Sequence, residues 1–472
     1  MSALWTAAEA AAATGGSASG DWTASGVSID TRSLRPGDLF VALRGESRDG
    51  HAFVAEALAR GAAAALVGSR PPGVAADAPL LEVGDTLAGL EALGRAARTR
   101  SAARIAAGTG SVGKTGTKEA LRHVLSAQAP THASAASHNN HWGVPLSLAR
   151  LPPAAAYGVF ELGMNHAGEL TPLTRLVRPH VAIVTTIEPA HLEFFGTVEA
   201  IADAKAEIFA GVEPGGAAVL NLDNPHCRRL REHAARAGVE RILTFGAGAD
   251  ADLRLLDETG GAERSEVLAR WRGQGLAYRL GVPGRHWVLN SLAVLAAVDA
   301  LGADVPAAAA ALASLRPPPG RGARYPIRAG DGTGLLIDES YNANPASVRA
   351  ALQVLARLPG RRIAVLGDML ELGEAGPELH AGLRDEVAAA GVERLFTCGP
   401  LMRGLFDAVE PRRRAAHAPS AADLVADLRA ALRPGDVVLV KGSLGSRMGA
   451  VVAALRGDPL PAGDAAGARR AG

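Results

Sequence analysis

The sequence predicts an α/β protein of three domains, with a central doubly wound parallel sheet between two smaller α/β domains. Apolar, strand-like segments alternate with helical segments along most of the chain, which is typical of such sheets. The length of 472 residues fits about three domains of ~150 residues each. A glycine-rich motif, G-T-G-S-V-G-K-T at residues 108–115, lies where a strand is expected to turn into a helix.

The first domain is expected over residues 1–100 as a small α/β unit. Residues 38–43 have the apolar character of a buried strand, and residues 52–60 that of a helix. The apolar run through residues 52–67 is interrupted by Glu56 and Arg60 and is too short to cross a membrane.

The central domain is expected over residues 101–315. A short strand at 104–107, the glycine-rich turn and a helix at 114–125 begin it. Further segments are expected to be three buried strands at 157–162, 181–187 and 217–222, an antiparallel addition at 249–280 and a helix at 289–301. Such alternation predicts a mainly parallel sheet with helices on both faces.

The third domain is expected over residues 316–472 as a Rossmann-like α/β unit. It begins with the linker Arg316-Pro-Pro-Pro-Gly-Arg321, because prolines stop helices and stiffen the chain. Its expected elements are strands at 334–338, 362–367 and 436–440 and a helix at 345–358. The small, polar tail after Pro461 is expected to be frayed.

Composition excludes several classes of function. The net charge is +1 and Arg412-Arg-Arg414 is the one basic tract, so there is no electrostatic case for nucleic acid or an anionic membrane. Two isolated cysteines, Cys227 and Cys398, form neither a disulfide framework nor a zinc knuckle and fit a reducing compartment. The first residues include Glu9 and no basic segment, unlike a signal peptide. We expect a soluble, cytoplasmic monomer without membrane insertion or a nucleic-acid partner.

Lysine is rare in this chain: 45 of the 49 basic residues are arginine, and the four exceptions are Lys114, Lys118, Lys205 and Lys441. A lysine amine can lose its proton, whereas a guanidinium cannot, so lysine marks positions where arginine does not suffice. Lys118 is expected to be a surface residue. Judged alone, Lys205 could also be an exposed helical residue near Glu207.

The glycine-rich motif predicts a phosphate-binding loop. Its glycines permit a tight turn with backbone N–H groups close to an anion, and the following helix points its positive end at that anion. Lys114 would reach the β- and γ-phosphates, and Thr115 would ligate Mg²⁺. No N-K-x-D motif for guanine follows, which favours ATP over GTP. The expected loop residues are Gly108, Thr109, Gly110, Ser111, Val112, Gly113, Lys114 and Thr115.

Two further polar residues follow expected strands. Glu161, in V-F-E-L-G, would lie beside the phosphate loop at the carboxyl edge of the sheet, where it could hold Mg²⁺ with Thr115 or instead cap the next loop. His191, in T-T-I-E-P-A-H-L, ends another strand at the same edge and is a candidate ligand, although a lone histidine is more often structural.

These segments resemble the Mur ligase family, ATP-dependent amide-forming enzymes of peptidoglycan synthesis, over nearly the whole chain. Residues 110–115 resemble its G-[ST]-x-G-K-T loop, and S-H-N-N with W-G-V-P at 137–145 resembles its N-N-x-x-G-V-P segment. Glu161 matches the family's acidic metal ligand, His191 its A-H-L histidine and Lys205 its A-K-x-E-I-F lysine.

The resemblance implies roles for individual residues. Lys205 would be carbamylated by CO₂, which requires a primary amine, and Lys114, His191 and Lys205 would be catalytic. Thr115 and Glu161 would hold one Mg²⁺, and His191 with the Lys205 carbamate a second. Further contacts to ATP are implied for Asn290, Arg321, Asp338 and Lys441; the family usually has asparagine where Trp287 stands.

The resemblance also implies the substrates. D-E-S-Y-N-A-N-P at 338–345 and G-D-M-L-E-L-G at 367–373 resemble the member that joins D-alanyl-D-alanine to UDP-N-acetylmuramoyl-tripeptide through an acyl phosphate. Substrate contacts are implied for Thr31, Arg32, Asn139, Asn140, Tyr341, Asn342 and Asn344. The alternatives are another Mur-type ligase, a folylpolyglutamate-type ligase, and a phosphate-loop ATPase that acts through protein partners.

Overall fold

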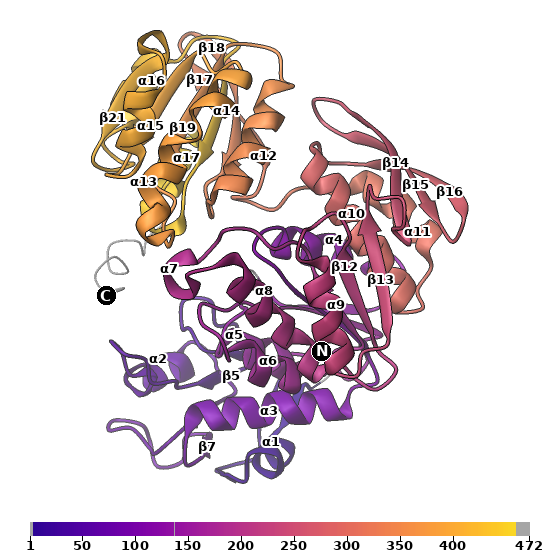
Figure 1. The fold of residues 1–472 in the computed structure, drawn as a ribbon. Coiled ribbons are helices and arrows are strands. Elements are labelled where there is room, and N and C mark those ends of the chain that lie inside the picture. Colours follow the sequence, from indigo (N-terminus) through magenta and orange to yellow (C-terminus); the bar gives the residue numbers. More distant parts are fainter. Residues whose placement is uncertain (1–2, 136, 459–472) are drawn as a thin grey trace.

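The computed structural model describes residues 3–135 and 137–458, and the tail expected to be frayed lies outside them. Three α/β units follow one another along the chain, each with its own main sheet (Figure 1). The predicted fold class is therefore confirmed, whereas the boundaries at residues 100 and 315 remain predictions. No helix within the described ranges is long and apolar enough to cross a membrane.

The N-terminal unit is built on a five-stranded sheet of order β2-β7-β6-β5-β4, parallel except for β2. Its elements are β1 Trp5–Thr6, α1 Ala7–Thr14, β2 Ser17–Ala18, β3 Thr23–Ala24, β4 Gly26–Ser28, β5 Asp38–Val41, η1 Gly50–Phe53, α2 Val54–Ala59, β6 Ala64–Val67, β7 Leu80–Glu82 and α3 Thr86–Arg100. The helix expected at 52–60 is divided between η1 and α2, because the Asp49 side chain caps a short 3₁₀ turn at His51 first.

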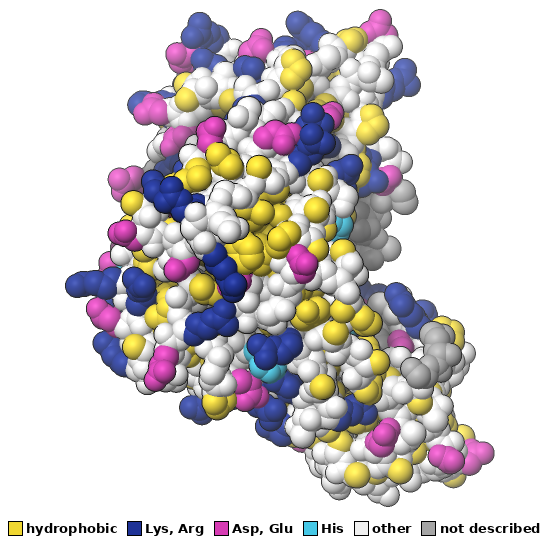
Figure 2. Space-filling model, turned by 90° about the vertical axis from the view of Figure 1, so that its right-hand side faces the viewer, with side chains coloured by type: hydrophobic (Ala, Val, Ile, Leu, Met, Phe, Trp, Pro, Cys, Tyr) yellow, Lys and Arg dark blue, Asp and Glu magenta, His cyan; other side chains and the backbone are white. Residues whose placement is uncertain are grey.

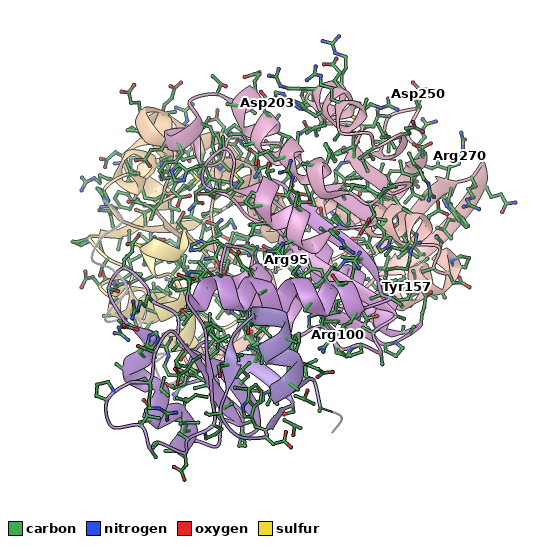
Figure 3. All side chains as sticks on the ribbon, turned by 90° about the horizontal axis from the view of Figure 1, so that it is seen from below. Arg95, Arg100, Tyr157, Asp203, Asp250 and Arg270 are labelled. Atoms are coloured by element: carbon green, nitrogen blue, oxygen red, sulfur yellow. The ribbon has the colours of Figure 1, made fainter. Side chains whose placement is uncertain are left out.

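Helix α3 joins this unit to the central one. It starts at Asp85, whose side chain accepts a hydrogen bond from the Ala88 N–H, a typical helix N-cap. Seen from below, the helix with Arg95 and Arg100 lies along the junction of the two units (Figure 3). The Arg100 guanidinium stacks over the Trp5 ring at 4.0 Å and donates to the Leu4 carbonyl at 2.7 Å.

The central unit has a nine-stranded sheet of order β16-β15-β14-β13-β12-β11-β8-β10-β9. Its strands are β8 Arg104–Thr109, β9 Thr131–Ala133, β10 Tyr157–Glu161, β11 Val181–Val184, β12 Ala217–Asn221, β13 Arg241–Gly246, β14 Leu253–Gly260, β15 Ser265–Trp271 and β16 Gln274–Leu280. Neighbouring strands from β8 to β14 pair in parallel. Strand β15 pairs antiparallel with both β14 and β16, so the predicted antiparallel addition is confirmed.

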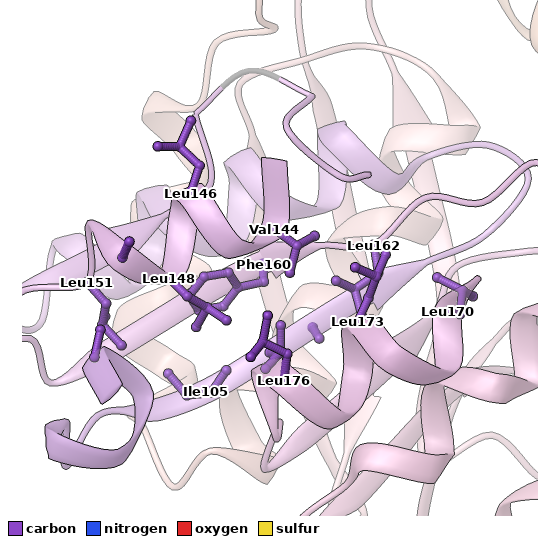
Figure 4. Packing of buried hydrophobic residues seen from close by; sticks show 14 of the residues in the cluster. Ile105, Val144, Leu146, Leu148, Leu151, Phe160, Leu162, Leu170, Leu173 and Leu176 are labelled. Atoms are coloured by element: carbon purple, nitrogen blue, oxygen red, sulfur yellow. The ribbon is translucent and has the colours of Figure 1, made fainter. Parts of the chain in front are cut away.

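Helices cover both faces of this sheet. They are α4 Lys114–Ser126, α5 Gly143–Ala149, α6 Leu170–Val177, α7 Leu192–Phe195, α8 Val198–Ala206, α9 Cys227–Arg236, α10 Arg285–Ala300 and α11 Val305–Ala311, with the 3₁₀ turns η2 Glu207–Gly211 and η3 Leu312–Ser314. Along β10, Val159 and Phe160 face opposite cores, as the alternation of a strand requires. Phe160 packs with Leu148, Leu173 and Leu176 on the α5–α6 side (Figure 4).

The C-terminal unit has a six-stranded sheet of order β17-β18-β22-β19-β20-β21. Its elements are β17 Ala323–Ala329, β18 Gly332–Glu339, α12 Pro345–Ala356, β19 Arg362–Gly367, η4 Gly373–Ala375, α13 Gly376–Ala381, α14 Arg384–Ala389, β20 Arg394–Cys398, α15 Met402–Ala408, η5 Pro411–Arg413, β21 Arg414–Ala418, α16 Val425–Ala431, β22 Val437–Lys441, η6 Leu444–Ser446 and α17 Gly449–Arg456. All pairs are parallel except the unforeseen β17–β18 hairpin.

Charged side chains of both signs occur on the face of the molecule in Figure 2, mostly towards its edges. Acidic and basic groups are mixed on this face. This distribution accords with the net charge of +1.

Candidate active site

A cavity of about 530 Å³ lies between the central and C-terminal units. It is bounded by the carboxyl ends of β8, β10, β11 and β12, where ligands bind in sheets of this type, and on its other side by α12 and the ends of β18 and β22. The predicted residues that line it are Ser111, Val112, Gly113, Lys114, Thr115, Asn139, Glu161, His191, Asn290, Arg321, Tyr341, Asn342, Asn344 and Lys441.

The phosphate loop has the backbone that its glycines predict. Gly110 and Gly113 have φ angles of 147° and 87°. A Cβ at Gly110 would collide with the Thr185 hydroxyl, and one at Gly113 would lie 2.9 Å from the amide oxygen of Asn290. Helix α4 begins directly after Gly113, so the positive end of its dipole faces the cavity.

The segment after β11 holds this loop in place. The Ser111 N–H donates to the Thr186 carbonyl at 2.9 Å, and the Ser111 hydroxyl donates to the Glu188 carbonyl at 2.9 Å. The Thr185 hydroxyl donates to the Val112 carbonyl at 2.5 Å. Two neighbouring parallel strands, β8 and β11, therefore fix the loop before any ligand arrives.

Thr115, Glu161 and Asn139 form one hydrogen-bonded group. The Thr115 hydroxyl donates to Glu161 Oε2 at 2.8 Å, and the Asn139 amide donates to Oε1 at 2.7 Å. Glu161, 1 % exposed, thus lies beside the phosphate loop, as the sequence predicts, and its magnesium role stays a prediction. No group of three or more His, Cys, Asp or Glu side chains in the described ranges could enclose a metal. These oxygen donors suit Mg²⁺, which usually keeps waters and takes phosphate oxygens as its other ligands.

Lys205 is almost entirely buried, with 1 % of its surface exposed, so an exposed position on α8 is excluded. Burial, and secondarily the charge of Lys114, lowers the pKa of Lys205 well below its usual value. Within residues 3–135 and 137–458, its amine has no hydrogen bond or ion pair. Glu207 instead accepts from the Gly168 N–H and the Thr171 hydroxyl. The amine of Lys205 is thus buried and shifted towards its neutral form.

The expectation that Lys118 lies on the surface is wrong, because the side chain is 3 % exposed. Lys118 follows Lys114 by four residues and lies on the same, inward face of α4. Its amine donates to the Ser134 carbonyl at 2.8 Å and pairs with Glu119 at 2.8 Å. The Ser134 hydroxyl in turn accepts from the Glu161 N–H at 3.2 Å, so Lys118 helps to place Glu161.

His191 connects the two sides of the cavity. It lies in the turn after β11 with a φ of 61°, and its Nδ1 is 2.5 Å from Oε2 of Glu371 in the C-terminal unit. The two atoms are in close polar contact, although the ring N–H is not aligned as in a hydrogen bond. Contact with His191 is the main cause that lowers the pKa of Glu371, and the charge of Lys114 contributes.

The C-terminal unit contributes two cations to the cavity. The Arg321 guanidinium lies 4.3 Å from the centre of the Tyr341 ring. The amine of Lys441 donates to the Asn342 carbonyl at 2.9 Å and lies 3.4 Å from Glu339. Burial lowers the pKa of Lys441, and Glu339 opposes this effect.

Other predicted site residues lie outside the cavity lining. Asp338 accepts from the Gly320 N–H at 2.9 Å and from the Ser340 hydroxyl at 2.6 Å, so it shapes the turn before Arg321. Asn140 accepts from the Gly143 N–H at the start of α5. The remaining ones are Gly108, Thr109 and Gly110 at the end of β8, Lys205 on α8, and Thr31 and Arg32 in the N-terminal unit.

Sequence reasoning did not single out several residues that line or border the cavity. Glu188 lines it, and burial raises the pKa of its carboxyl. Asn224 donates to the Ile187 carbonyl at 2.9 Å and thereby holds the same segment. Glu371 lies in the G-D-M-L-E-L-G stretch and Glu188 in T-I-E-P-A-H, so both motifs contained the signal. Only the fold shows that Glu188 lines the cavity and that Glu371 approaches His191 beside it.

Known proteins resemble this chain over almost its full length. Three family profiles match: "Mur ligase family, catalytic domain" at residues 23–99, "Mur ligase middle domain" at 109–298 and "Mur ligase, glutamate ligase domain" at 323–444. The UDP-N-acetylmuramoyl-tripeptide–D-alanyl-D-alanine ligase of Escherichia coli (strain K12) is 38% identical, covering 92% of this chain and 94% of the relative. The ligase of the same name from Bacillus subtilis (strain 168) is 33% identical, with coverages of 92% and 94%.

Solved structures agree with these relatives. A crystal structure of MurF from Acinetobacter baumannii has a TM-score of 0.83 and 31% identity, covering 96% of this chain and 99% of that one. MurF ligase from Thermotoga maritima in complex with ADP has a TM-score of 0.76 and 28% identity, with coverages of 92% and 97%. The chain therefore belongs to the Mur ligase family.

Proposed function

We propose that this protein is the ATP-dependent ligase that joins D-alanyl-D-alanine to UDP-N-acetylmuramoyl-tripeptide in peptidoglycan synthesis. One observation carries the proposal: Lys114 and Thr115 of the phosphate loop share a single cavity with Tyr341, Asn342 and Asn344 of the S-Y-N-A-N-P segment. The names of the relatives point to the same reaction. These substrates fit a cytoplasmic enzyme.

The cavity suits ATP. The start of α4 and Lys114 present positive charge to the phosphates, while Asn290 lies against Gly113 at the same end of the cavity. Arg321 and Lys441 reach the cavity from the C-terminal unit. Nucleotide contacts from both units mean that closing one unit on the other completes the site.

Thr115 and Glu161 are the residues that would hold one Mg²⁺, and His191 and a carbamylated Lys205 would hold or position a second. Bound there, Mg²⁺ would neutralise phosphate charge. The buried amine of Lys205 is suited to the modification, because its lowered pKa favours the neutral form. Addition of CO₂ to the neutral amine forms an N–C bond, opens one C=O π bond of CO₂, releases the N–H proton and converts an uncharged group into an anion.

The reaction has two steps. A carboxylate oxygen of the tripeptide attacks the γ-phosphorus of ATP, and ADP leaves with the electrons of the broken P–O bond. The amine of D-alanyl-D-alanine then attacks the acyl carbon, loses a proton, and phosphate leaves. Lys114 reduces the repulsion between the two anions of the first step, so positioning and electrostatics supply most of the catalysis. Enclosure between the two units protects the acyl phosphate from water.

Contacts at the two ends of the substrates are also proposals. Thr31 and Arg32 lie in the N-terminal unit, where the UDP end would bind, with the Arg32 side chain exposed and paired to Asp30 at 2.7 Å. Asn139, which donates to Glu161, and Asn140 would contact the tripeptide. Tyr341, Asn342 and Asn344 would meet the incoming dipeptide near the start of α12.

An ADP-release assay tests the function. Release should require UDP-N-acetylmuramoyl-tripeptide and D-alanyl-D-alanine together. Addition of meso-diaminopimelate to the UDP-N-acetylmuramoyl-dipeptide would instead indicate the preceding ligase. Sustained ATP hydrolysis without any small acceptor would indicate an ATPase that acts through protein partners.

A further inference from the structure

The loop after β19 in the C-terminal unit docks on the turn after β11 in the central unit. Besides the 2.5 Å approach of Glu371 to His191, the Glu193 N–H points at the Glu371 carbonyl at 3.4 Å. A Cβ at Gly373 would lie 3.2 Å from the Glu193 Cα, so the two backbones meet closely there. This contact joins the units directly beside the cavity, since His191 lines it.

The loop that carries Glu371 is held firmly within its own unit. The Met369 N–H donates to His380 Nε2 at 2.9 Å, and His380 Nδ1 donates to the Gly376 carbonyl at 2.6 Å. The Leu370 N–H donates to the Ser443 hydroxyl at 2.9 Å. Because His380 is fully buried and fixes both ends of the loop, Glu371 moves with the whole C-terminal unit.

Both residues of the pair have unusual backbone conformations. Glu371 has a φ of 64° and His191 a φ of 61°, a region that residues other than glycine rarely adopt. Such conformations cluster at functional sites.

We propose that Glu371 is a positioning residue. When the C-terminal unit closes on the central unit, Glu371 contacts His191 and orients its imidazole for binding the metal. The inference rests on the proposed function, in which His191 binds or positions Mg²⁺. An imidazole with Nδ1 facing a carboxylate keeps Nε2 for a metal, and such partners orient metal-binding histidines. Metal affinity and closure are thereby linked: each should strengthen the other.

Mn²⁺ binding to the full-length protein with saturating ADP tests this inference. Free Mn²⁺ is followed by electron paramagnetic resonance for the wild type, Glu371→Gln and the matched control Glu374→Gln, which removes an exposed charge from the same loop. We expect Glu371→Gln to lower the affinity of the protein for one of the bound Mn²⁺ ions by about 10-fold. This is the lower end of the range found when a metal-binding histidine loses its hydrogen-bonding partner. Glu374→Gln should bind like the wild type.

A double-mutant cycle shows whether Glu371 influences Mn²⁺ affinity through His191. If Glu371 acts through His191, adding Glu371→Gln to His191→Gln should cause no further loss of Mn²⁺ affinity. Unchanged binding by Glu371→Gln, or fully additive losses in the double variant, would overturn the inference. Because no acceptor is present, failure here is separate from failure of the proposed ligase reaction, which the wild-type ADP-release assay decides.

Discussion

The amine of Lys114 lies 2.7 Å from the carbonyl oxygen of Gly110, four residues earlier in the same loop. The lysine therefore folds back on the loop that would hold the phosphates, and burial lowers the pKa of its amine. This hydrogen bond joins no separate elements of the fold. Phosphate oxygens would offer the amine a stronger, charge-assisted partner than a carbonyl does.

Replacing Lys114 with alanine should therefore abolish catalysis and leave the fold intact. We expect turnover to fall about 100-fold or more, as for the loss of one preorganised electrostatic group. Thermal unfolding should stay near the wild-type midpoint, because only a hydrogen bond within the loop is lost. ADP release and circular dichroism melting measure the two effects. A large drop in melting temperature with activity retained would refute the assignment.

Lys118 should behave in the opposite way, as a structural lysine. Lys118→Met removes the donor to the Ser134 carbonyl and the partner of Glu119. Leaving a buried acceptor without its donor costs about 1–3 kcal/mol, and urea unfolding should show a loss of that size. Arg122→Gln is the control, because it loses an exposed contact with the same Glu119. Equal stability of the two variants would contradict a structural role.

The sequence predicts the phosphate loop and its acidic partner well, for physical reasons. The spacing of Gly108, Gly113 and Lys114 defines a backbone turn, and that turn requires a strand before and a helix after it. Glu161 ends a strand that pairs with β8 in parallel, so its position beside the loop follows from sheet geometry. Local rules are sufficient for both.

Features that depend on tertiary packing escape such rules. The burial of Lys118 depends on the loop that covers this face of α4, and helical periodicity alone does not identify that loop. The approach of Glu371 to His191 depends on how two units meet. Strand β17 contains Pro326, which disfavours a strand prediction but is tolerated at the edge of a sheet.

His180 should make stability depend on pH. Its Nδ1 accepts from the Ile105 N–H at 2.9 Å, and burial, with Arg104 and Arg98 nearby, lowers its pKa from 6.5 to about 4. Between pH 6.5 and 4, His180 is therefore protonated in the unfolded chain but not in the native state. Its full contribution to stability is present above pH 6.5 and is lost as the pH falls towards 4, by about 2 kcal/mol after allowing for solvent screening of the half-buried ring.

Urea unfolding between pH 7 and 4 measures this loss. His180→Asn keeps an acceptor near the Nδ1 position and cannot titrate, so its stability should vary less over that interval. At each pH, the free energy of unfolding of the variant is subtracted from that of the wild type. The contribution of the carboxylates cancels in this difference, because both proteins contain them. A parallel pH dependence for the variant and the wild type would exclude His180 as the cause.

Variants of Lys205 distinguish a carbamate from an ordinary cation at this position. The side chain is buried, its amine is shifted towards the neutral form, and the positive charge of Lys114 acts on it. An anion at this position would attract Lys114 and Mg²⁺, whereas a second cation would repel both. Lys205→Arg keeps a positive charge that cannot be lost or carbamylated, so a salt-bridge role predicts near-normal activity and a carbamate role predicts severe loss.

Lys205→Ala completes the test of the carbamate, because it removes the charged side chain and leaves an empty volume in its place. Its activity should be nearly absent, because both the amine and the carbamate are removed. Added acetate should restore part of it, since a small carboxylate can occupy the vacated space and supply the missing negative charge. Chloride at equal ionic strength is the control and should restore nothing, because it reproduces the screening without the carboxylate. Full activity of the arginine variant, or equal rescue by chloride, would exclude the carbamate.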